Sequence, residues 1–168
     1  MSESRAVFSI LAVNHPGVLL RVSGLVSRRG FNIDSLVACT TENPEFSRLT
    51  LVVTGDEATF AQMVRQLLKM EDILKVRVLD PDECASSESL LVKIRADEAG
   101  RCAALQLAQG YGARVVDIGR HTITLDLTGR SETIDELVGR LVPLGIVEMA
   151  RTGVHALQRG DGTIHDDE

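Results

Sequence analysis

An internal repeat constrains the fold of this chain more than any other feature of its sequence. Residues 54–67 follow the pattern Thr-Gly-x-x-x-Thr-x-x-x-x-Val-x-x-Leu, and residues 128–141 follow the same pattern at a constant offset of 74. Upstream of these segments, Gly17 and Gly100 correspond at an offset of 83. Because self-similarity at a fixed offset is typical of a duplicated structural unit, we expect two copies of one fold in tandem within the 168 residues.

Hydrophobic periodicity predicts the same order of elements in both copies. Strands are predicted where apolar residues alternate with polar ones or run continuously, and helices where apolar residues recur three and four positions apart. In the first copy the predicted strands are 6–13, 31–38, 49–53 and 74–78, and the predicted helices are 18–29 and 57–68. In the second copy the strands are 90–96, 113–118, 123–127 and 146–150, and the helices are 101–109 and 132–142. The order βαββαβ in each copy predicts an α+β fold of two tandem ferredoxin-like units.

Two polar segments suggest where the domains end. Residues 80–88 have no hydrophobic periodicity and contain Pro81 and two serines, which is typical of a linker. Four of the last eight residues are acidic, as in a solvated terminus. We therefore predict domains at 1–82 and 83–160, followed by a flexible acidic tail at 161–168.

Composition excludes several classes of function. A net charge of −6 lacks the basic footprint that nucleic-acid binding needs, and aromatic residues at 3% leave few stacking platforms for bases. No apolar run approaches the ~18 residues of a membrane span, and the N-terminus does not have the pattern of a signal peptide. We expect a cytoplasmic protein with no nucleic-acid or membrane partner, and we expect buried thiols at Cys39, Cys84 and Cys102, which lack zinc-site spacing.

The sequence shows no arrangement typical of a catalytic or metal centre. The four histidines, His15, His121, His155 and His165, lack metal-ligand spacing, and no nucleophile-elbow, phosphate-loop or dinucleotide motif is present. We therefore predict no metal site and no catalytic residue. A stand-alone hydrolase remains an alternative that turnover by the purified chain would support. A ligand-responsive transcription factor would need a basic helix-turn-helix, for which the two units leave no room.

One segment of the first copy is suited to binding a small zwitterion. Residues 14–19, Asn-His-Pro-Gly-Val-Leu, lie where the first predicted strand ends and the first helix begins. Free N–H groups at a helix start attract a carboxylate, and Gly17 lets such a group approach the backbone closely. Pro16 stiffens the turn, and the amide of Asn14 both donates and accepts hydrogen bonds. The alternative is an ordinary strand-to-helix turn with an Asx cap.

Asn32 is a second unusual residue, because it opens an otherwise apolar strand. In a βαββαβ unit this position lies at the opposite end of the sheet from Asn14, roughly 20 Å away, so one small ligand cannot contact both within one chain. The second strand is also a sheet edge, and antiparallel pairing about a twofold axis would bring Asn32 of the partner subunit toward Asn14. The alternative for Asn32 is an ordinary residue at a strand start.

The second copy does not repeat the candidate site. At the position corresponding to residues 14–17 it has Asp97-Glu98-Ala99-Gly100, and two carboxylates at a helix start would repel an anion. We therefore expect only the first half to bind a small ligand, and the second half to present another surface, such as one for partner docking.

At these residues the chain resembles a known family, the small regulatory subunit of acetohydroxyacid synthase, also called acetolactate synthase. The segments that resemble its ACT domain are 14–19, 29–36 and 47–50, and the similarity continues through 91–94, 150–153 and 158–160. The first motif alone would indicate only some ACT domain, whereas the combination is specific and covers nearly the whole chain.

The resemblance implies a function and a set of partners. It implies a noncatalytic subunit that activates a thiamine-diphosphate-dependent catalytic large subunit and transmits feedback inhibition by valine in the biosynthesis of valine, leucine and isoleucine. Thiamine diphosphate, Mg and FAD are then expected on the catalytic subunit, with no cofactor in this chain. The alternative is an ACT-type amino-acid-binding regulator of a different partner enzyme.

The resemblance also assigns residues to the effector site, at the interface of an ACT homodimer. The effector-binding residues it implies are Asn14, His15, Pro16, Gly17, Val18 and Leu19 from one chain, and Asn32 and Ile33 from the other. One departure from the family concerns charge: members often carry an acidic residue just before the motif asparagine, where this chain has Val13.

Overall fold

The computed structural model describes residues 4–80 and 84–166, except the side chains of residues 98 and 99, and it divides into two units. The first unit comprises the chain up to Ser86 together with the segment from Val154 onward, and the second comprises Ser87–Gly153.

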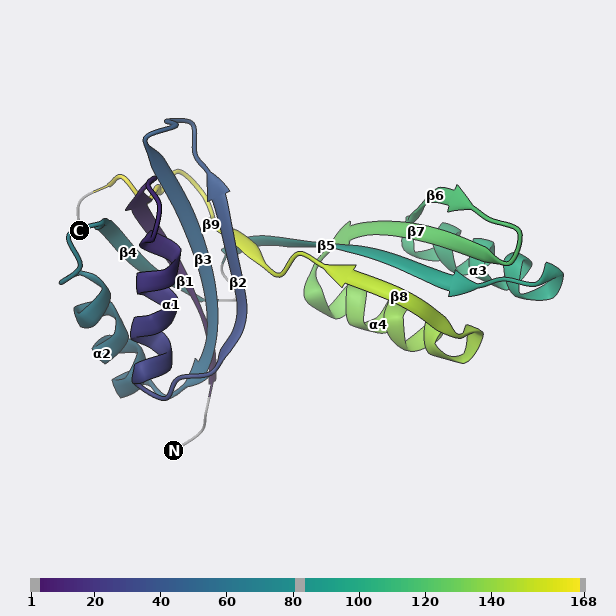
Figure 1. The fold of residues 1–168 in the computed structure, drawn as a ribbon, viewed down its shortest axis with the longest axis horizontal. Helices are drawn as coiled ribbons and strands as arrows, with labels where there is room; N and C mark the ends of the chain where they lie inside the picture. The colour runs from purple at the N-terminus through teal and green to yellow at the C-terminus, as the bar shows by residue number, and fades with distance from the viewer. Residues whose placement is uncertain (1–3, 81–83, 167–168) are drawn as a thin grey trace. The chain divides into compact units, whose positions relative to one another are not determined.

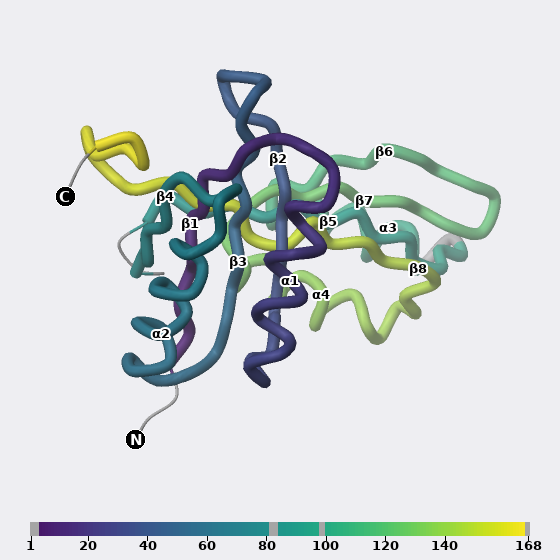
Figure 2. Tube along the Cα trace, turned by 60° about the vertical axis from the view of Figure 1, so that its left-hand side comes forward, coloured from purple at the N-terminus to yellow at the C-terminus, as the bar shows by residue number. Residues whose placement is uncertain are grey.

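The first unit has the predicted order βαββαβ. Its elements are β1 (Ser4–Val13), α1 (Val18–Arg28), β2 (Ile33–Thr40), β3 (Phe46–Gly55), α2 (Glu57–Leu67) and β4 (Ile73–Leu79). The strands form an antiparallel sheet in the order β2-β3-β1-β4, with α1 and α2 on one face (Figures 1 and 2). The prediction of a ferredoxin-like unit with β2 at one edge is confirmed.

The burial of β1 explains why residues 6–13 are apolar except for Ser9. Phe8 and Ile10 are fully buried against α1 and α2, and the Phe8 ring meets that of Phe60 edge to face at 5.8 Å between centroids. On the opposite face, Val7 packs in a second cluster whose other members are Val52, Leu79, Cys84, Val154 and Ala156. Because both faces of β1 are covered, its residues need not alternate between apolar and polar.

The second unit repeats the order of the first. Its elements are β5 (Cys84–Arg95), α3 (Glu98–Tyr111), β6 (Arg114–Ile118), β7 (Thr122–Gly129), α4 (Ser131–Leu141), a 3₁₀ turn (Val142–Leu144) and β8 (Ile146–Arg151). The strand order β6-β7-β5-β8 corresponds to that of the first unit, and a short strand, β9 (His155–Gln158), pairs with β5. In the described part of the chain, no helix is long and apolar enough to cross a membrane.

The structure differs from the predicted linker at 80–88. Strand β5 begins at Cys84, so residues 84–88 are strand, while residues 81–83 lie outside the described part. The hydrophobic pattern did not predict a strand here because Glu88 is polar although its side chain is buried, at 3% exposure. A buried carboxylate interrupts the alternation of apolar and polar residues that predicts a strand. Cys84 is the one buried cysteine, whereas Cys39 and Cys102 are exposed, so the prediction of buried thiols was wrong for those two.

The structure also differs from the predicted domain end at 160 and the predicted tail at 161–168. Residues 154–166 belong with the first unit, where Ile164 is 4% exposed. The Lys75 ammonium donates to the carbonyls of His165 and Asp166 at 2.7 and 3.1 Å, and the Asp166 carboxylate accepts from the Thr163 N–H at 2.6 Å. These contacts use backbone groups, which an acidic composition does not reveal. Residues 167–168 lie outside the described part.

An ion pair holds Glu88 inside the second unit. Arg151 donates to the Glu88 carboxylate and, at 2.6 Å, to Asp135, while the Ser131 hydroxyl donates to Glu88 at 2.7 Å. Burial alone would raise the pKa of Glu88, but the hydrogen bonds from Arg151 and Ser131 outweigh it and lower the pKa. The stabilisation is therefore present above the ordinary carboxyl pKa and is lost as the pH falls through the folded value.

We predict that Arg151→Met lowers the free energy of unfolding by about 3–5 kcal/mol, because it leaves a buried carboxylate without its cation. Urea denaturation of the full chain measures this. Arg114→Met is the matched control, since Arg114 also pairs with a carboxylate, that of Asp126, but is 78% exposed. Its cost should stay below about 1 kcal/mol. Equal costs for the two variants would contradict the assignment of a buried ion pair.

Candidate functional site

The loop between β1 and α1 is fastened to the loop between β2 and β3. The Asn14 backbone N–H donates to the Glu45 carbonyl at 2.7 Å, and the Asn14 side-chain amide donates to the Pro44 carbonyl at 2.9 Å. Both loops lie at the same end of the sheet (Figure 2). Among the described residues, nothing donates to the side-chain oxygen of Asn14, so this exposed acceptor remains available to a ligand.

Helix α1 begins at an exposed loop without a side-chain cap. Its N-cap is Gly17, which has a left-handed φ of +94°, and no described side chain accepts a hydrogen bond from the first turn. The Asx-capped turn considered as an alternative is therefore not what the structure shows. The first-turn N–H groups and the positive end of the helix dipole together form a site suited to a carboxylate.

The other helices show that an uncapped start alone does not define a site. Helix α2 is capped by Asp56, which accepts from Thr59 N–H at 2.8 Å, and α3 is capped by Asp97, which accepts from Gly100 N–H at 2.7 Å. Helix α4 also lacks a side-chain cap, at Arg130. Helix α1 differs from α4 in its left-handed glycine, where a side chain would be strained and where a ligand can reach the backbone.

Charged side chains surround the start of α1. The His15 ring contacts the Asp72 carboxylate at 2.7 Å, and Arg21 of α1 contacts the other oxygen of Asp72 at 2.5 Å. The hydrogen bond to the Pro16 carbonyl, and then that to Asp72, raise the pKa of His15. Desolvation would raise the pKa of Asp72, but hydrogen bonds from His15 and Arg21 lower it. The start of α1 is therefore surrounded by two basic side chains, His15 and Arg21, and by one carboxylate, Asp72. When His15 is protonated, the net positive charge favours an anionic ligand.

Sequence reasoning missed the contributions of Asp72 and of the 44–45 carbonyls. The signal for Asp72 was available in the fold: β4 pairs with β1, and Val13 N–H donates to the Asp72 carbonyl at 2.9 Å, so the start of β4 must lie beside the end of β1. The 44–45 carbonyls belong to a loop whose conformation no periodicity predicts.

The predicted residues 14–19 lie together, with Val18 buried in the core and Leu19 45% exposed. Asn32 and Ile33 lie elsewhere. Val13 faces Phe46 on β3, whereas Ile33 faces Val53, seven residues further along that strand. At ~3.3 Å per residue the separation is about 23 Å. The predicted separation is confirmed, and one chain does not bring the two parts together around a small ligand.

The surroundings of Asn32 are polar. Its side-chain amide donates to Asp34 at 2.8 Å, and the other oxygen of Asp34 accepts from the Thr54 hydroxyl at 2.8 Å. These residues line a cavity of about 640 Å³ that also includes Asp56. Ile33 is half-buried and packs against the core of the first unit. The cavity is large enough for a small polar ligand group but holds no part of the α1 start.

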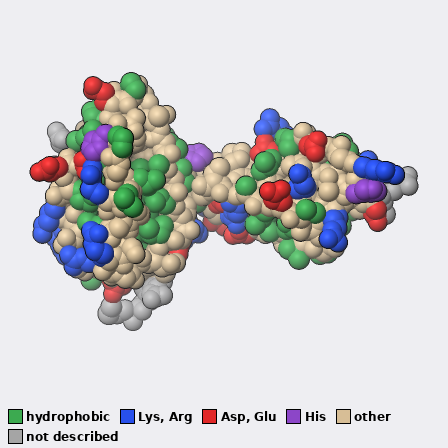
Figure 3. Space-filling model, in the orientation of Figure 1, with side chains coloured by type: hydrophobic (Ala, Val, Ile, Leu, Met, Phe, Trp, Pro, Cys, Tyr) green, Lys and Arg blue, Asp and Glu red, His purple; other side chains and the backbone are tan. Residues whose placement is uncertain are grey.

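Strand β2 forms an edge of the sheet of the first unit. It pairs with β3 on one side, and its register shifts between Ile33 and Ser35. Hydrophobic side chains gather on the side of the first unit where α1 and β2 lie (Figure 3), and on α1 Leu20 is 76% exposed. An open edge beside exposed apolar side chains favours association. Among the described residues, no three His, Cys, Asp or Glu side chains come together as metal ligands would.

Comparison with known proteins gives consistent similarities over both units. The family model described as AHAS small subunit-like ACT domain matches residues 8–75, and that described as small subunit of acetolactate synthase matches residues 87–160. A probable acetolactate synthase small subunit from Methanothermobacter thermautotrophicus is 38% identical to this chain, and the alignment covers 98% of both chains. The acetolactate synthase small subunit of Mycolicibacterium smegmatis is 39% identical, and the alignment covers 90% of this chain and 89% of that one. The crystal structure of the acetolactate synthase small subunit from Thermotoga maritima matches with a TM-score of 0.88 and 32% identity, covering 95% of this chain and 99% of that one.

We predict that Asp72→Asn moves the titration midpoint of His15 downward, because it removes a carboxylate that favours the charged ring. The raised pKa means that charged His15 stabilises the fold fully below its ordinary pKa, and that this contribution is lost as the pH rises through the folded value. An NMR titration of the His15 ring protons measures the midpoint. Asp117→Asn on β6 is the control and should leave it in place; an unmoved midpoint in Asp72→Asn would refute the contact.

Proposed function

Because this chain belongs to the family of acetolactate synthase small subunits, we propose that it is a noncatalytic regulatory subunit that binds and activates the catalytic large subunit and transmits feedback inhibition by valine. The observation that carries the effector part of this proposal is the start of α1: an exposed, uncapped turn on a left-handed Gly17, beside the available oxygen of Asn14. An ACT-type regulator of another enzyme is the alternative. Similarity to small subunits over 98% of the chain supports the first.

The geometry suggests how valine binds. Its carboxylate accepts hydrogen bonds from the N–H groups of Val18 and Leu19, where the helix dipole favours negative charge. Its ammonium donates to the side-chain oxygen of Asn14, whose amide nitrogen is occupied by the Pro44 carbonyl. A left-handed glycine at the N-cap keeps the approach to these N–H groups free of a Cβ.

The proposal requires a homodimer, because one chain carries the two parts of the site about 23 Å apart. In an antiparallel twofold dimer formed along β2, Asn32 and Ile33 of the partner subunit complete the pocket at the start of α1, and each dimer has two such sites. Valine then bridges two chains. It regulates the catalytic subunit if its affinity differs between the active and less active states, typically by ~1–3 kcal/mol.

The proposal also covers the complex with the catalytic subunit. The cofactors thiamine diphosphate, Mg²⁺ and FAD belong to the catalytic subunit, and the complex is cytoplasmic. The second unit is the candidate for partner docking, since Asp97 caps α3 with its own carboxylate, whereas the start of α1 has no side-chain cap.

We predict that the chain raises the activity of its catalytic subunit, that valine lowers it, and that Asn14→Ala retains the activation but weakens valine inhibition at least tenfold. Reconstituted acetolactate synthase assays over a valine titration measure both effects. Asp97→Ala, at the corresponding helix start of the second unit, is the control and should retain both. The effector site would be refuted by unchanged inhibition in Asn14→Ala, and the proposed partner by absence of activation with the wild-type chain.

The two-chain site makes a second prediction. Asn14→Ala and Asn32→Ala each remove one half of every site, but a mixed dimer carries one site with both asparagines intact. Equal mixing of the two variants by co-refolding should therefore restore wild-type affinity at about one quarter of the sites, measured by calorimetric titration with valine. Mixing Asn14→Ala with the double variant restores none. Recovery in that control, or none in the first mixture, would contradict a shared site.

A further inference from the structure

A second cavity lies in the first unit, on the face of its sheet opposite α1 and α2. It has a volume of about 680 Å³, within the range of small-molecule sites. One wall is formed by the end of β2 and the start of β3, at residues 39–42 with Arg48 and Thr50. The other wall is the segment 155–165, apart from Arg159. The start of α1 does not line it, so this cavity is separate from the proposed valine site.

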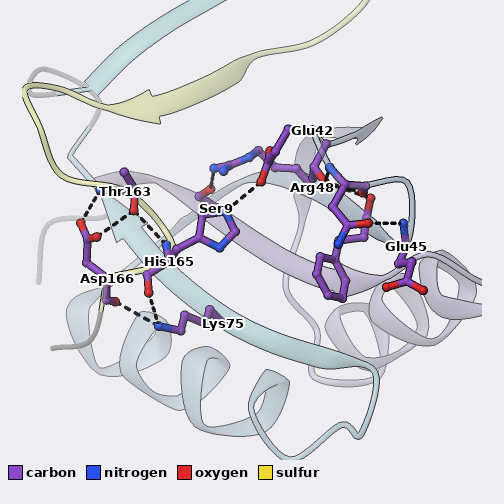
Figure 4. A network of polar contacts seen from close by, with 11 residues as sticks. Ser9, Glu42, Glu45, Arg48, Lys75, Thr163, His165 and Asp166 are labelled. Carbon is purple, nitrogen blue, oxygen red and sulfur yellow. Dashed lines mark hydrogen bonds and ion pairs between the residues drawn. The ribbon is translucent and has the colours of Figure 1, made fainter.

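The wall made by the C-terminal segment is held by cations of β4. Lys75 donates to the carbonyls of His165 and Asp166, and Arg77 donates to the Asp166 carbonyl at 2.8 Å and to the Gln158 side chain at 2.7 Å. Figure 4 shows the hydrogen bonds from Lys75 to His165 and Asp166. One wall of the cavity is thus held by the pairing of β2 with β3, and the other by the hydrogen bonds from Lys75 and Arg77.

Arg48 is the unusual residue of this cavity. It is partly buried, and its guanidinium donates at 2.8 Å to the hydroxyl of Ser9, a residue only 2% exposed. Among the described residues, no carboxylate lies within ion-pair distance of Arg48: Glu42 pairs with His165, at 3.1 Å (Figure 4). Burial lowers the pKa of Arg48, although Glu42 acts in the opposite direction. A partly desolvated cation with one neutral partner is a ready site for an anion.

The other surroundings restrict the anion. Ala156 and Ile164, at 2% and 4% exposure, give the cavity an apolar side. The carboxylates of Glu42 and Asp161 also line the cavity, so a doubly charged anion such as phosphate meets about twice the repulsion that a single carboxylate meets. We propose that this cavity binds a small monocarboxylate with an apolar body, its carboxylate paired with Arg48 and its apolar part against Ala156 and Ile164.

The probe that tests this is 3-methylbutanoate, which has the carbon skeleton of valine without the amine. Titrated into the full-length chain, it should shift backbone NMR signals of residues around Cys39, Thr50 and Ile164. Arg48→Met should weaken its affinity at least tenfold, and the neutral probe 3-methylbutanamide should bind at least tenfold more weakly than the acid. Arg65→Met, an exposed arginine of α2, is the matched control and should leave affinity unchanged.

Two further variants distinguish this cavity from the proposed valine site, and a specific loss of binding from a folding defect. Cys39→Phe narrows the cavity from its exposed wall and should block the acid without altering the buried residues. Asn14→Ala should weaken valine binding yet leave 3-methylbutanoate binding intact, so the two proposals fail separately. The cavity proposal is overturned if the acid does not bind, if Arg48→Met and Cys39→Phe both bind it normally, if phosphate binds as well as the acid, or if the shifted signals are confined to residues 14–19.

Discussion

Strand β1 is hydrogen-bonded to β3 on one side and to β4 on the other, and it is buried on both faces. These contacts fix the position at which the chain leaves the sheet after Val13. They therefore also fix the start of α1. Asn14 donates hydrogen bonds to the carbonyls of residues 44 and 45, which follow β2, and His15 contacts the Asp72 carboxylate just before β4. The end of a paired strand thus holds an exposed loop and an uncapped helix start in a defined position.

The two units show how one fold is used in two ways. At the corresponding helix starts, the first unit has Gly17 without a side-chain cap, and the second has Asp97 bonded to Gly100 N–H. Both an N-cap carboxylate and a ligand carboxylate accept hydrogen bonds from N–H groups at a helix start, so the second unit has an internal acceptor of a kind that the first unit lacks. The duplication therefore provides one helix start stabilised by its own chain and one that, under the proposed function, gains stability when valine binds.

Much of this arrangement could be predicted from the sequence, because it depends on local patterns. The repeat at an offset of 74 and the apolar periodicities predict both βαββαβ units, and the glycine at position 17 predicts an accessible helix start. The remainder depends on contacts distant in sequence. The burial of Glu88 could not be predicted because its partner, Arg151, lies 63 residues away in the sequence. The position of segment 154–166 could not be predicted because Lys75 and Arg77 bind its backbone carbonyls, which every sequence has. The proposed valine site also needs a second chain. An open edge strand predicts that a second chain pairs there, but it does not predict the geometry of the completed site.

The loop between β2 and β3 connects the proposed valine site with the second cavity. Its Glu42 faces the cavity and pairs with His165, while its carbonyls at 44–45 hold Asn14. Between these points the loop is closed by its own hydrogen bonds, from Thr41 hydroxyl to Asn43 carbonyl and from Glu45 N–H to the Asn43 side chain (Figure 4). In the proposed complex, an anion beside Arg48 acts electrostatically on Glu42, which belongs to the same loop as the carbonyls that hold Asn14. Because linkage is reciprocal, any factor by which the cavity ligand alters valine affinity is the factor by which valine alters the affinity of the cavity ligand.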